Sequence, residues 1–341
     1  MTDDTGGPAA GGLTLWNDPF LRARRGAAGR LAALDPARVA RVAVIKHAAL
    51  GDLVLARPFL REARRHFPAA RITLCLSDNY QRGAPLDLAD AVHLTRRGLP
   101  WRAALRNYRE LGPHDLVFDL TATARSRWLV RLNRAGVAVG FAASRLDGRL
   151  YDVVVPRTGF KYEAETFLDQ LQAVGLPVGW PPDFALPATP RPQPAPYALY
   201  FATASTPGKS WPADRFAALV AGLARERPDL DHVVTAGLAD WELAVAGRLA
   251  QELAGVPRAR VAAPDDALAA WVAHAALVVS NDTGARNLAI AAGTPTVGLF
   301  FNTPPFRYLP RFGRHEAVFR PGRALPEVAE ALAAARRVLG G

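Results

Sequence analysis

The stretch VVSNDTGARNLAIAAGTPTVGLF, residues 278–300, places a polar knot between two apolar runs. The runs 276–280 and 294–300 are short and apolar, which favours buried strands, whereas 285–293 has the character of a short apolar helix. The knot between them is Asn281-Asp282-Thr283-Gly284. A strand, a turn, a helix and another strand in this order are the repeating unit of a parallel α/β sheet.

The knot lies where a strand ends and a helix begins, so backbone N–H groups at Thr283, Gly284 and Ala285 are expected to face a ligand. The N-terminus of a helix stabilises negative charge, and a diphosphate suits it. Asp-Thr-Gly is also the signature of aspartic proteases, but their chemistry needs two such loops in a β-rich fold. This chain has one copy in an α/β setting, which argues against a protease.

Strand and helix patterns alternate on both sides of a proline-rich stretch. We expect a tail (1–12) and a basic helix (17–34) within residues 1–40, an α/β domain over 41–175, a linker over 176–196 and a second α/β domain over 197–341. The first domain includes one helix over 52–67, and the last helix, 325–339, could pack back on the first domain. Alternation of this kind predicts parallel sheets covered on both faces, with a cleft between the domains.

The composition narrows the classes of function. Among the 42 basic residues only Lys46, Lys161 and Lys209 are lysines, and the formal net charge is +11. The arginines are dispersed without interleaved aromatic residues, which argues against nucleic-acid binding and leaves anionic substrates or a membrane surface. No run is long enough to span a membrane, the polar N-terminus is unlike a signal peptide, and the single Cys75 permits no internal disulfide. We expect a cytoplasmic protein, with or without peripheral contact at the inner face of the inner membrane.

The loop 46–52 follows a predicted strand and ends in Gly51-Asp52. Gly51 suits a tight turn there. Asp52 has two interpretations: it caps the following helix, or it is a functional carboxylate at a strand end. The GxGxxG pattern of dinucleotide-binding domains is absent from this position, which argues against a dehydrogenase.

Two further loops carry polar side chains at strand ends. The segment 202–212 contains Thr203, Ser205 and Lys209, which is typical of an anion-binding loop. An ordinary polar loop is the alternative. The segment 235–242 ends in two acids, of which Asp240 or Glu242 could accept a hydrogen bond from a ribose hydroxyl.

Together these motifs resemble glycosyltransferase family 9, the ADP-heptose:lipopolysaccharide heptosyltransferases. The resemblance covers about residues 41–320 and rests on three matches in the family's order: Lys46, Gly51-Asp52 and Pro58; Lys209, Trp211 and Pro212; Asp282-Thr283-Gly284 and Gly293-Thr294-Pro295. It implies the GT-B fold, with two facing Rossmann-like domains, the acceptor mainly on the first and the nucleotide-sugar on the second.

The resemblance also implies roles for individual residues. Asp52 would be the general base of an inverting transfer from a nucleoside-diphosphate sugar, ADP-linked and heptose-like, to a glycan or lipid-linked acceptor of the lipopolysaccharide type. No metal, cofactor or nucleic acid is expected. The donor would be held by Ser205, Lys209, Glu242, Asp282, Thr283 and Gly284, and the cleft would also contain Lys46, Gly51, Thr203, Arg286 and Asn287.

The sequence departs from the family at two positions. The family has histidine three residues after the Gly-Asp aspartate and three residues after the glycine of Asp-Thr-Gly. This chain has Leu55 and Asn287 there. Two functions therefore stay open: a transferase with a different sugar or acceptor, and a nucleotide-sugar-binding protein on the same fold that has lost its chemistry.

Overall fold

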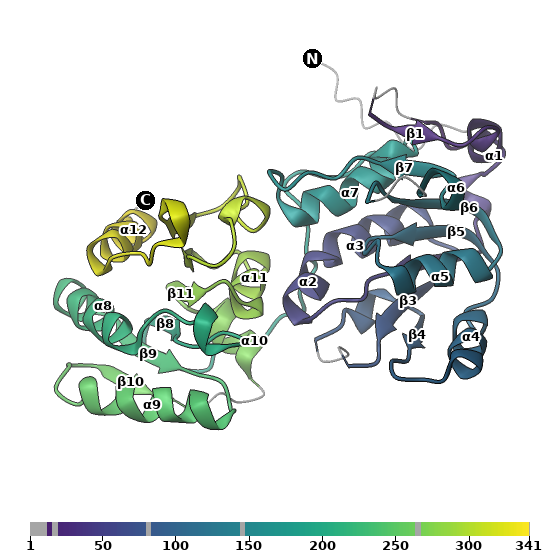
Figure 1. Ribbon diagram of the computed structural model, residues 1–341. Helices are drawn as coiled ribbons and strands as arrows, with labels where there is room; N and C mark the ends of the chain where they lie inside the picture. Colours follow the sequence, from purple (N-terminus) through teal and green to yellow (C-terminus); the bar gives the residue numbers. More distant parts are fainter. Residues whose placement is uncertain (1–11, 16–19, 80–82, 144–146, 263–266, 341) are drawn as a thin grey trace, which may run out of the picture. The chain divides into compact units, whose positions relative to one another are not determined.

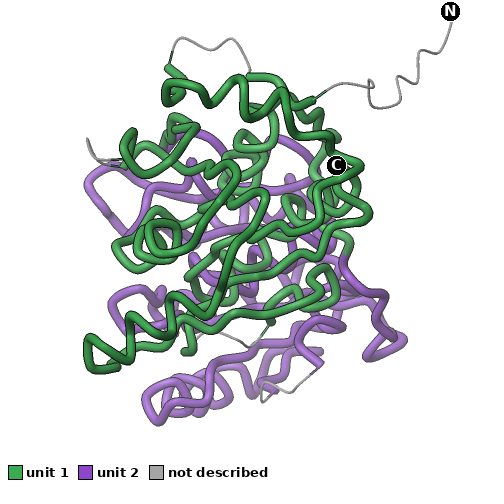
Figure 2. The backbone as a smooth tube through the Cα atoms, turned by 90° about the vertical axis from the view of Figure 1, so that its right-hand side faces the viewer, with its two compact units in different colours: residues 1–158, 163–185 green, residues 159–162, 186–341 purple. Residues whose placement is uncertain are grey.

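The chain divides into two compact units in the computed structural model, which describes residues 12–15, 20–79, 83–143, 147–262 and 267–340. Unit 1 comprises residues 1–158 and 163–185, and unit 2 comprises residues 159–162 and 186–341 (Figure 2). The chain passes from unit 1 to unit 2 after Ala185, inside the proline-rich stretch.

Unit 1 contains one sheet, whose strands are β1 (Arg22–Ala23), β2 (Arg41–Ile45), β3 (Arg71–Ser77), β4 (Ala91–Thr95), β5 (His114–Asp119), β6 (Ala135–Phe141) and β7 (Val153–Val155). The spatial order is β1-β7-β6-β5-β2-β3-β4. All neighbouring strands are parallel except β1 and β7. The inner strands are buried on both faces, as a parallel sheet covered by helices requires.

The helices of unit 1 are α1 (Ala27–Ala32), α2 (Leu50–Leu55), α3 (Arg57–His66), α4 (Trp101–Arg109), α5 (Ala124–Leu132), α6 (Asp147–Leu150) and α7 (Glu163–Ala173). Helix α3 packs against α7, and α4 packs against α5. Figure 1 shows these helices beside the strands of the unit.

Two helix predictions in unit 1 are wrong in detail. The helix expected over 17–34 is confined to Ala27–Ala32, because Gly26 adopts φ 78° at its start and Arg22–Ala23 pair with β7 instead; residues 16–19 lie outside the described residues. The helix expected over 52–67 is broken into α2 and α3 at Ala56. Pro58 has no N–H to donate to Val54, which is the bond that a continuous helix needs there.

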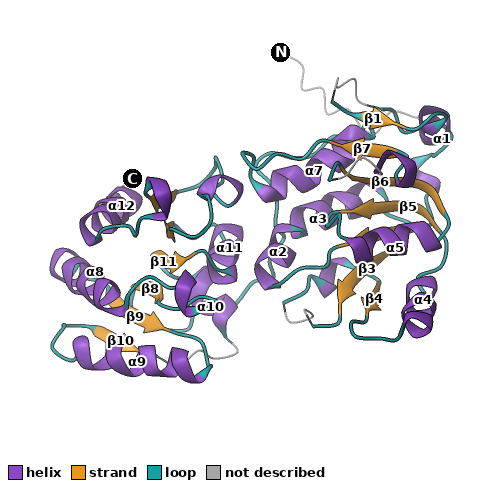
Figure 3. Ribbon diagram, in the orientation of Figure 1, coloured by secondary structure: helices purple, strands orange, loops and turns teal. Residues whose placement is uncertain are grey.

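Unit 2 contains a second, fully parallel sheet of six strands. They are β8 (Tyr197–Phe201), β9 (Asp231–Thr235), β10 (Ala259–Val261), β11 (Leu277–Asn281), β12 (Thr296–Phe300) and β13 (His315–Phe319), in the order β10-β9-β8-β11-β12-β13. The helices are α8 (Ala213–Glu226), α9 (Asp240–Glu252), α10 (Leu268–Ala273), α11 (Gly284–Ala291) and α12 (Val328–Gly340). Figure 3 shows helices flanking the strands.

Alternate residues of β11 face opposite sides of this sheet. Val279 packs with residues of α8 and α12, and Val278 packs with residues of α10 and α11. Helix α12 lies against α8 and strands β11–β13 of its own unit. Strands β7, β10 and β13 were not predicted. Strands β10 and β13 are edge strands, and their partly exposed sequences lack a fully apolar run.

Each sheet has one point at which the order of its strands reverses. In unit 1 it lies between β2 and β5, and in unit 2 between β8 and β11. Ligands of open parallel sheets bind at the carboxyl ends of strands beside such a switch point. The loops that follow these four strands are therefore the first places to look for a site. In the described part of the chain no helix is long and apolar enough to cross a membrane.

Candidate functional site

The switch point of unit 2 is bridged by one amide side chain. Asn281, the last residue of β11, accepts a hydrogen bond from the Trp211 N–H at 2.8 Å through Oδ1. Its Nδ2 donates to the carbonyl oxygens of Phe201 and Ala202 at 3.3 and 3.2 Å. Both ends of the loop 202–211 are thus attached to the residue before Asp282. The sequence analysis placed Asn281 in the knot but assigned it no role.

Ser205 and Lys209 are exposed in this loop, and Lys209 ends a short 3-10 turn, Pro207–Lys209. Among the described residues neither side chain has a hydrogen bond or an ion pair. The loop beneath them is ordered by Ser210, whose hydroxyl accepts the Ala204 N–H at 2.9 Å and donates to the Thr206 carbonyl at 3.2 Å. A firmly held backbone therefore presents one ammonium and one hydroxyl that are available to a ligand.

Thr203 and Glu242 lie together. The Thr203 hydroxyl donates to Glu242 Oε1 at 2.8 Å and accepts the Gly237 N–H at 2.9 Å. Glu242 Oε2 accepts the Ala239 N–H at 3.1 Å, so the carboxylate also caps α9. A Cβ at Gly237 would lie 2.1 Å from the Glu242 carboxylate oxygens, so any larger residue would displace this carboxylate. Glu242 retains lone pairs for a further hydroxyl donor.

Helix α11 begins at Gly284, with Thr283 as its N-cap residue. Among the described residues no side chain caps this end. The Arg286 N–H donates to the Thr283 carbonyl at 3.2 Å, and the N–H groups before it have no intrahelical acceptor. Asp282, immediately before, accepts a hydrogen bond from the Thr303 hydroxyl. This end of α11 therefore combines N–H donors with a fixed carboxylate.

Arg286 and Asn287 are buried, with 1% and 5% of their surfaces exposed. The Arg286 side chain runs inward, where Nη1 donates to the Tyr308 carbonyl at 2.6 Å and the guanidinium lies 5.2 Å from the centre of the Phe300 ring. Burial lowers the pKa of Arg286 to about 10, which still leaves it charged at neutral pH.

In unit 1, Asp52 is the third residue of α2, and the N-cap residue is Ala49. The interpretation of Asp52 as an N-cap is therefore wrong, although its charge is in the first turn. Gly51 is inside the same helix and makes no tight turn, which corrects its expected role. Among the described residues no hydrogen bond or ion pair involves the Asp52 carboxylate. Leu55, at the position of a family histidine, is a fully buried core residue.

Lys46 follows β2 and is 3% exposed, with Nζ 4.2 Å from the centre of the Phe167 ring. The backbone of its neighbour His47 is also fixed, because the His47 N–H donates to Thr121 Oγ1 at 2.8 Å. The Thr121 hydroxyl in turn donates to the Ile45 carbonyl at 3.2 Å. The turn after β5 therefore braces the chain on both sides of Lys46.

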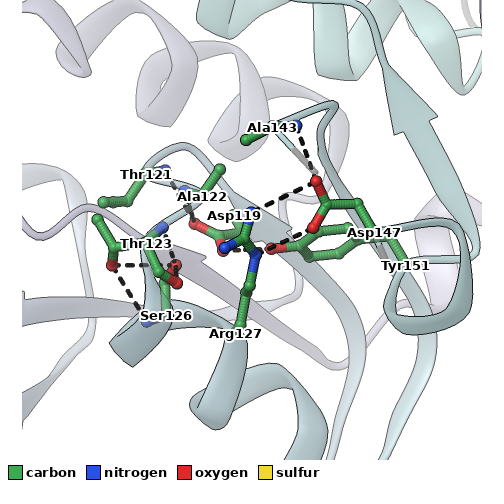
Figure 4. Close-up of polar contacts among 9 residues, drawn as sticks. All are labelled: Asp119, Thr121, Ala122, Thr123, Ser126, Arg127, Ala143, Asp147 and Tyr151. Atoms are coloured by element: carbon green, nitrogen blue, oxygen red, sulfur yellow. Dashed lines mark hydrogen bonds and ion pairs between the residues drawn. The ribbon is translucent and has the colours of Figure 1, made fainter. Parts of the chain in front are cut away.

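A buried network supports that turn (Figure 4). Asp119 Oδ1 accepts the N–H groups of Thr121 and Ala122 at 2.8 and 2.9 Å, which holds Ala122 at φ 56°. Asp119 Oδ2 accepts the Tyr151 hydroxyl at 2.7 Å. Burial, and then the charge of Asp119, raise the pKa of Tyr151. This network was not predicted from the sequence, although Asp119 ends β5 much as Asn281 ends β11.

Asp147, which is also buried, is the other carboxylate of this view. It accepts hydrogen bonds from Arg127 Nε at 3.0 Å and from the Ala143 N–H at 2.7 Å. Helix α5, which contains Arg127, begins with a reciprocal cap between Thr123 and Ser126. These contacts fix α5 and α6 around Asp119. Within the described residues, no three His, Cys, Asp or Glu side chains are grouped as metal ligands.

Solved structures share this architecture. The E. coli heptosyltransferase WaaC with ADP-2-deoxy-2-fluoro heptose is 21% identical, with a TM-score of 0.69 over 88% of this chain and 99% of that one. The Veillonella parvula glycosyl transferase of family 9 is 19% identical, with a TM-score of 0.64 over 89% and 98%. The E. coli ADP-heptose lps heptosyltransferase II is 17% identical, with a TM-score of 0.63 over 88% and 98%. These similarities establish the two-domain α/β fold predicted from the sequence.

No curated protein matches the chain by sequence. The profile of glycosyltransferase family 9 (heptosyltransferase) matches residues 104–331, more than half of the 341 residues. The matched range contains the loops around Lys209 and Asp282 and begins after Asp52. The chain therefore belongs to glycosyltransferase family 9, the heptosyltransferase family, and is a glycosyltransferase.

Proposed function

We propose that the protein transfers a heptose-like sugar from an ADP-linked donor to a glycan acceptor of the lipopolysaccharide type, with inversion at the anomeric carbon. One observation carries the proposal. The loop with Ser205 and Lys209 is attached at both ends to Asn281, which immediately precedes the knot and the start of α11. A solved relative of the same fold holds an ADP-heptose analogue.

The donor chemistry divides among these residues by charge. The Lys209 ammonium, the Ser205 hydroxyl and the first N–H groups of α11 are donors that suit a diphosphate and its developing charge as a leaving group. Glu242 is a hydrogen-bond acceptor and suits a ribose hydroxyl. The carboxylate of Asp282 would repel a phosphate, so we assign it to a hydroxyl of the transferred sugar, beside the diphosphate.

On unit 1, Asp52 is assigned as the general base. Its carboxylate takes the proton of the acceptor hydroxyl as that oxygen bonds to the anomeric carbon. The bond from this carbon to the diphosphate oxygen breaks on the opposite face, and the nucleoside diphosphate leaves with the electron pair. The absence of a partner for Asp52 within the described residues supports this role, because a base must be available to its substrate.

Two measurements test the proposal. Thermal unfolding with ADP, GDP, UDP and CDP should show a selective rise in Tm with ADP, because a ligand of the native state stabilises it by mass action. Incubation with ADP-heptose and truncated lipopolysaccharide acceptors should give a glycosylated product of inverted anomeric configuration by NMR. Absence of nucleotide stabilisation would reject the donor site, and a retained configuration would reject the single displacement.

A binding protein that lacks turnover is the second candidate. It is favoured by Leu55, a fully buried aliphatic side chain where the family has histidine. Selective ADP-heptose binding without transfer across a broad acceptor panel would support it. Replacing Leu55 with histidine and Asn287 with histidine, singly and together, would then show whether either position restores turnover.

A further inference from the structure

Arg286 carries a positive charge inside unit 2 that no acid neutralises at close range. Its side chain is 1% exposed. Within the described residues no carboxylate oxygen lies within 4.0 Å of the guanidinium, and Nε and Nη2 have no hydrogen-bond partner. Burying an unpaired guanidinium costs several kcal/mol, so a residue of this kind is expected to have a function.

The segment 302–308 is attached near both of its ends. Arg286 Nη1 donates to the carbonyl of Tyr308 at 2.6 Å. Asp282 accepts a hydrogen bond from the hydroxyl of Thr303. Asp282 of the knot thus contacts the start of this segment and Arg286 of α11 contacts its end, through side chains that are four residues apart.

This segment forms one wall of a cavity of about 240 Å³ at the carboxyl ends of β12 and β13. Its lining includes Phe300, Thr303, Phe306, Phe319 and Arg323. Phe300 also lies under the guanidinium of Arg286. Arg286 therefore contacts one residue that lines this cavity and holds the end of the segment that forms its wall.

Gly298 of β12 makes room for this arrangement. A Cβ at Gly298 would lie 2.4 Å from Arg286 Nε and 2.6 Å from the Phe300 ring. Both distances are shorter than real Cβ contacts, so any larger residue would displace the guanidinium or the ring. The pair Arg286 and Gly298 acts as one packing unit beneath the knot.

We propose that Arg286 is a positioning residue that determines which sugar the donor site accepts: it holds the segment 302–308, whose Thr303 hydroxyl donates to Asp282, the carboxylate that we assign to the sugar. This inference rests on the proposed donor site. We assign the diphosphate and nucleotide contacts to Lys209, Ser205, Glu242 and the start of α11. Among the described residues, no hydrogen bond or ion pair joins the Arg286 side chain to Lys209, Ser205 or Glu242. Arg286 therefore affects the binding of the sugar and not the binding of the nucleotide.

The experiment compares the affinities of ADP and ADP-heptose by calorimetry. Arg286→Met should lower the affinity for ADP-heptose about tenfold and change the affinity for ADP less than about twofold. The reason is that one charged hydrogen bond and the fixed orientation of one carboxylate are lost. Arg286→Lys, which keeps a charge and a donor, should lose less. Thr303→Val should reproduce the selective loss from the other attachment point, and Thr303→Ser, which keeps the hydroxyl, should retain wild-type selectivity.

Gly298→Ala supplies a variant that leaves Arg286 itself in place, and it too should weaken ADP-heptose selectively. Gly247→Ala, at an exposed position of α9 with no atom within 4 Å of the added Cβ, is the control for a glycine substitution. Equal losses of affinity for ADP and for ADP-heptose would overturn the inference, as would unchanged affinities in Arg286→Met and Thr303→Val. Neither result would contradict the donor site. A folded wild type that binds ADP-heptose no better than ADP would overturn the inference, and one that binds neither would overturn the donor site as well.

Discussion

Asn281 accepts a hydrogen bond from the backbone N–H of Trp211, a residue 70 positions earlier, at 2.8 Å. The same amide donates to two carbonyl groups at the end of β8, so three of its hydrogen-bonding positions join two loops of the proposed donor site. A buried amide engaged in this way specifies one geometry, because any displacement leaves polar groups unpaired.

Asn281→Leu should therefore lower the free energy of unfolding by about 2–3 kcal/mol and weaken ADP binding at least tenfold. Urea unfolding and calorimetry measure the two effects. Asn281→Asp keeps the acceptor for the Trp211 N–H and loses the amide donors, so its ADP affinity should fall between wild type and Asn281→Leu. A stable Asn281→Leu protein with normal ADP affinity would remove Asn281 from the donor site.

Lys209→Ala should leave stability unchanged, because the exposed side chain has no partner among the described residues. ADP affinity should fall about tenfold or more through loss of a charge-assisted contact to phosphate, and the residual affinity should depend less on salt. Arg225→Ala removes an equally exposed cation from the last turn of α8 and is the matched control. Similar ADP affinities for the two variants would mean that Lys209 contributes only net charge.

Asp52→Asn should reduce the transfer rate by roughly 10² to 10⁴ without changing ADP affinity, since the base acts on the acceptor. Helix stability should change little, because loss of one first-turn charge is worth about 0.3–1 kcal/mol. Asp214→Asn makes the same chemical change in the first turn of α8 and should keep full activity. Normal turnover by Asp52→Asn would contradict the assignment of Asp52 as the general base.

Thr121→Val should reduce the transfer rate, because it removes both hydrogen bonds that brace the chain around Lys46. We expect a fall of about tenfold in kcat with unchanged ADP affinity, on the scale of one to two lost hydrogen bonds. Thr121→Ser keeps the hydroxyl and should restore kcat. If valine and serine were equally active, the brace would be structural only.

Stability should fall as the solution is acidified from pH 6.5 toward 4. Burial lowers the pKa of His47 and of His315 from 6.5 to about 4, so the unfolded chain binds protons in this window more readily than the native protein. Their contribution is fully present above pH 6.5, is lost as the pH falls through about 4, and amounts to ~3 kcal/mol each at most. Urea unfolding at pH 7.5, 5.5 and 4.5 measures it.

His47→Gln and His315→Asn should each flatten that pH profile, since neither amide titrates. A wild-type free energy of unfolding that stays constant from pH 6.5 to 4.5 would contradict the burial of these two rings.

Much of the fold could be predicted from local patterns. Strands β11 and β12 and helix α11 begin within two residues of the runs 276–280, 294–300 and 285–293 that the sequence predicts. Such elements depend on side-chain periodicity and turn residues, which are local properties of the chain. The same holds for the knot at 281–284, because a carboxylate, a hydroxyl and a glycine after an apolar run mark the end of a buried strand.

Only the tertiary structure decided which residues from distant parts of the sequence contact one another. Thr121 reaches the backbone of His47, and Arg286 turns inward over Gly298 toward Tyr308. Neither contact could be predicted from the sequence, because each joins positions many residues apart whose proximity depends on strand order. The sequence determined which chemistry each loop could offer. The order of the strands, with its reversal between β8 and β11, determined which loops lie together.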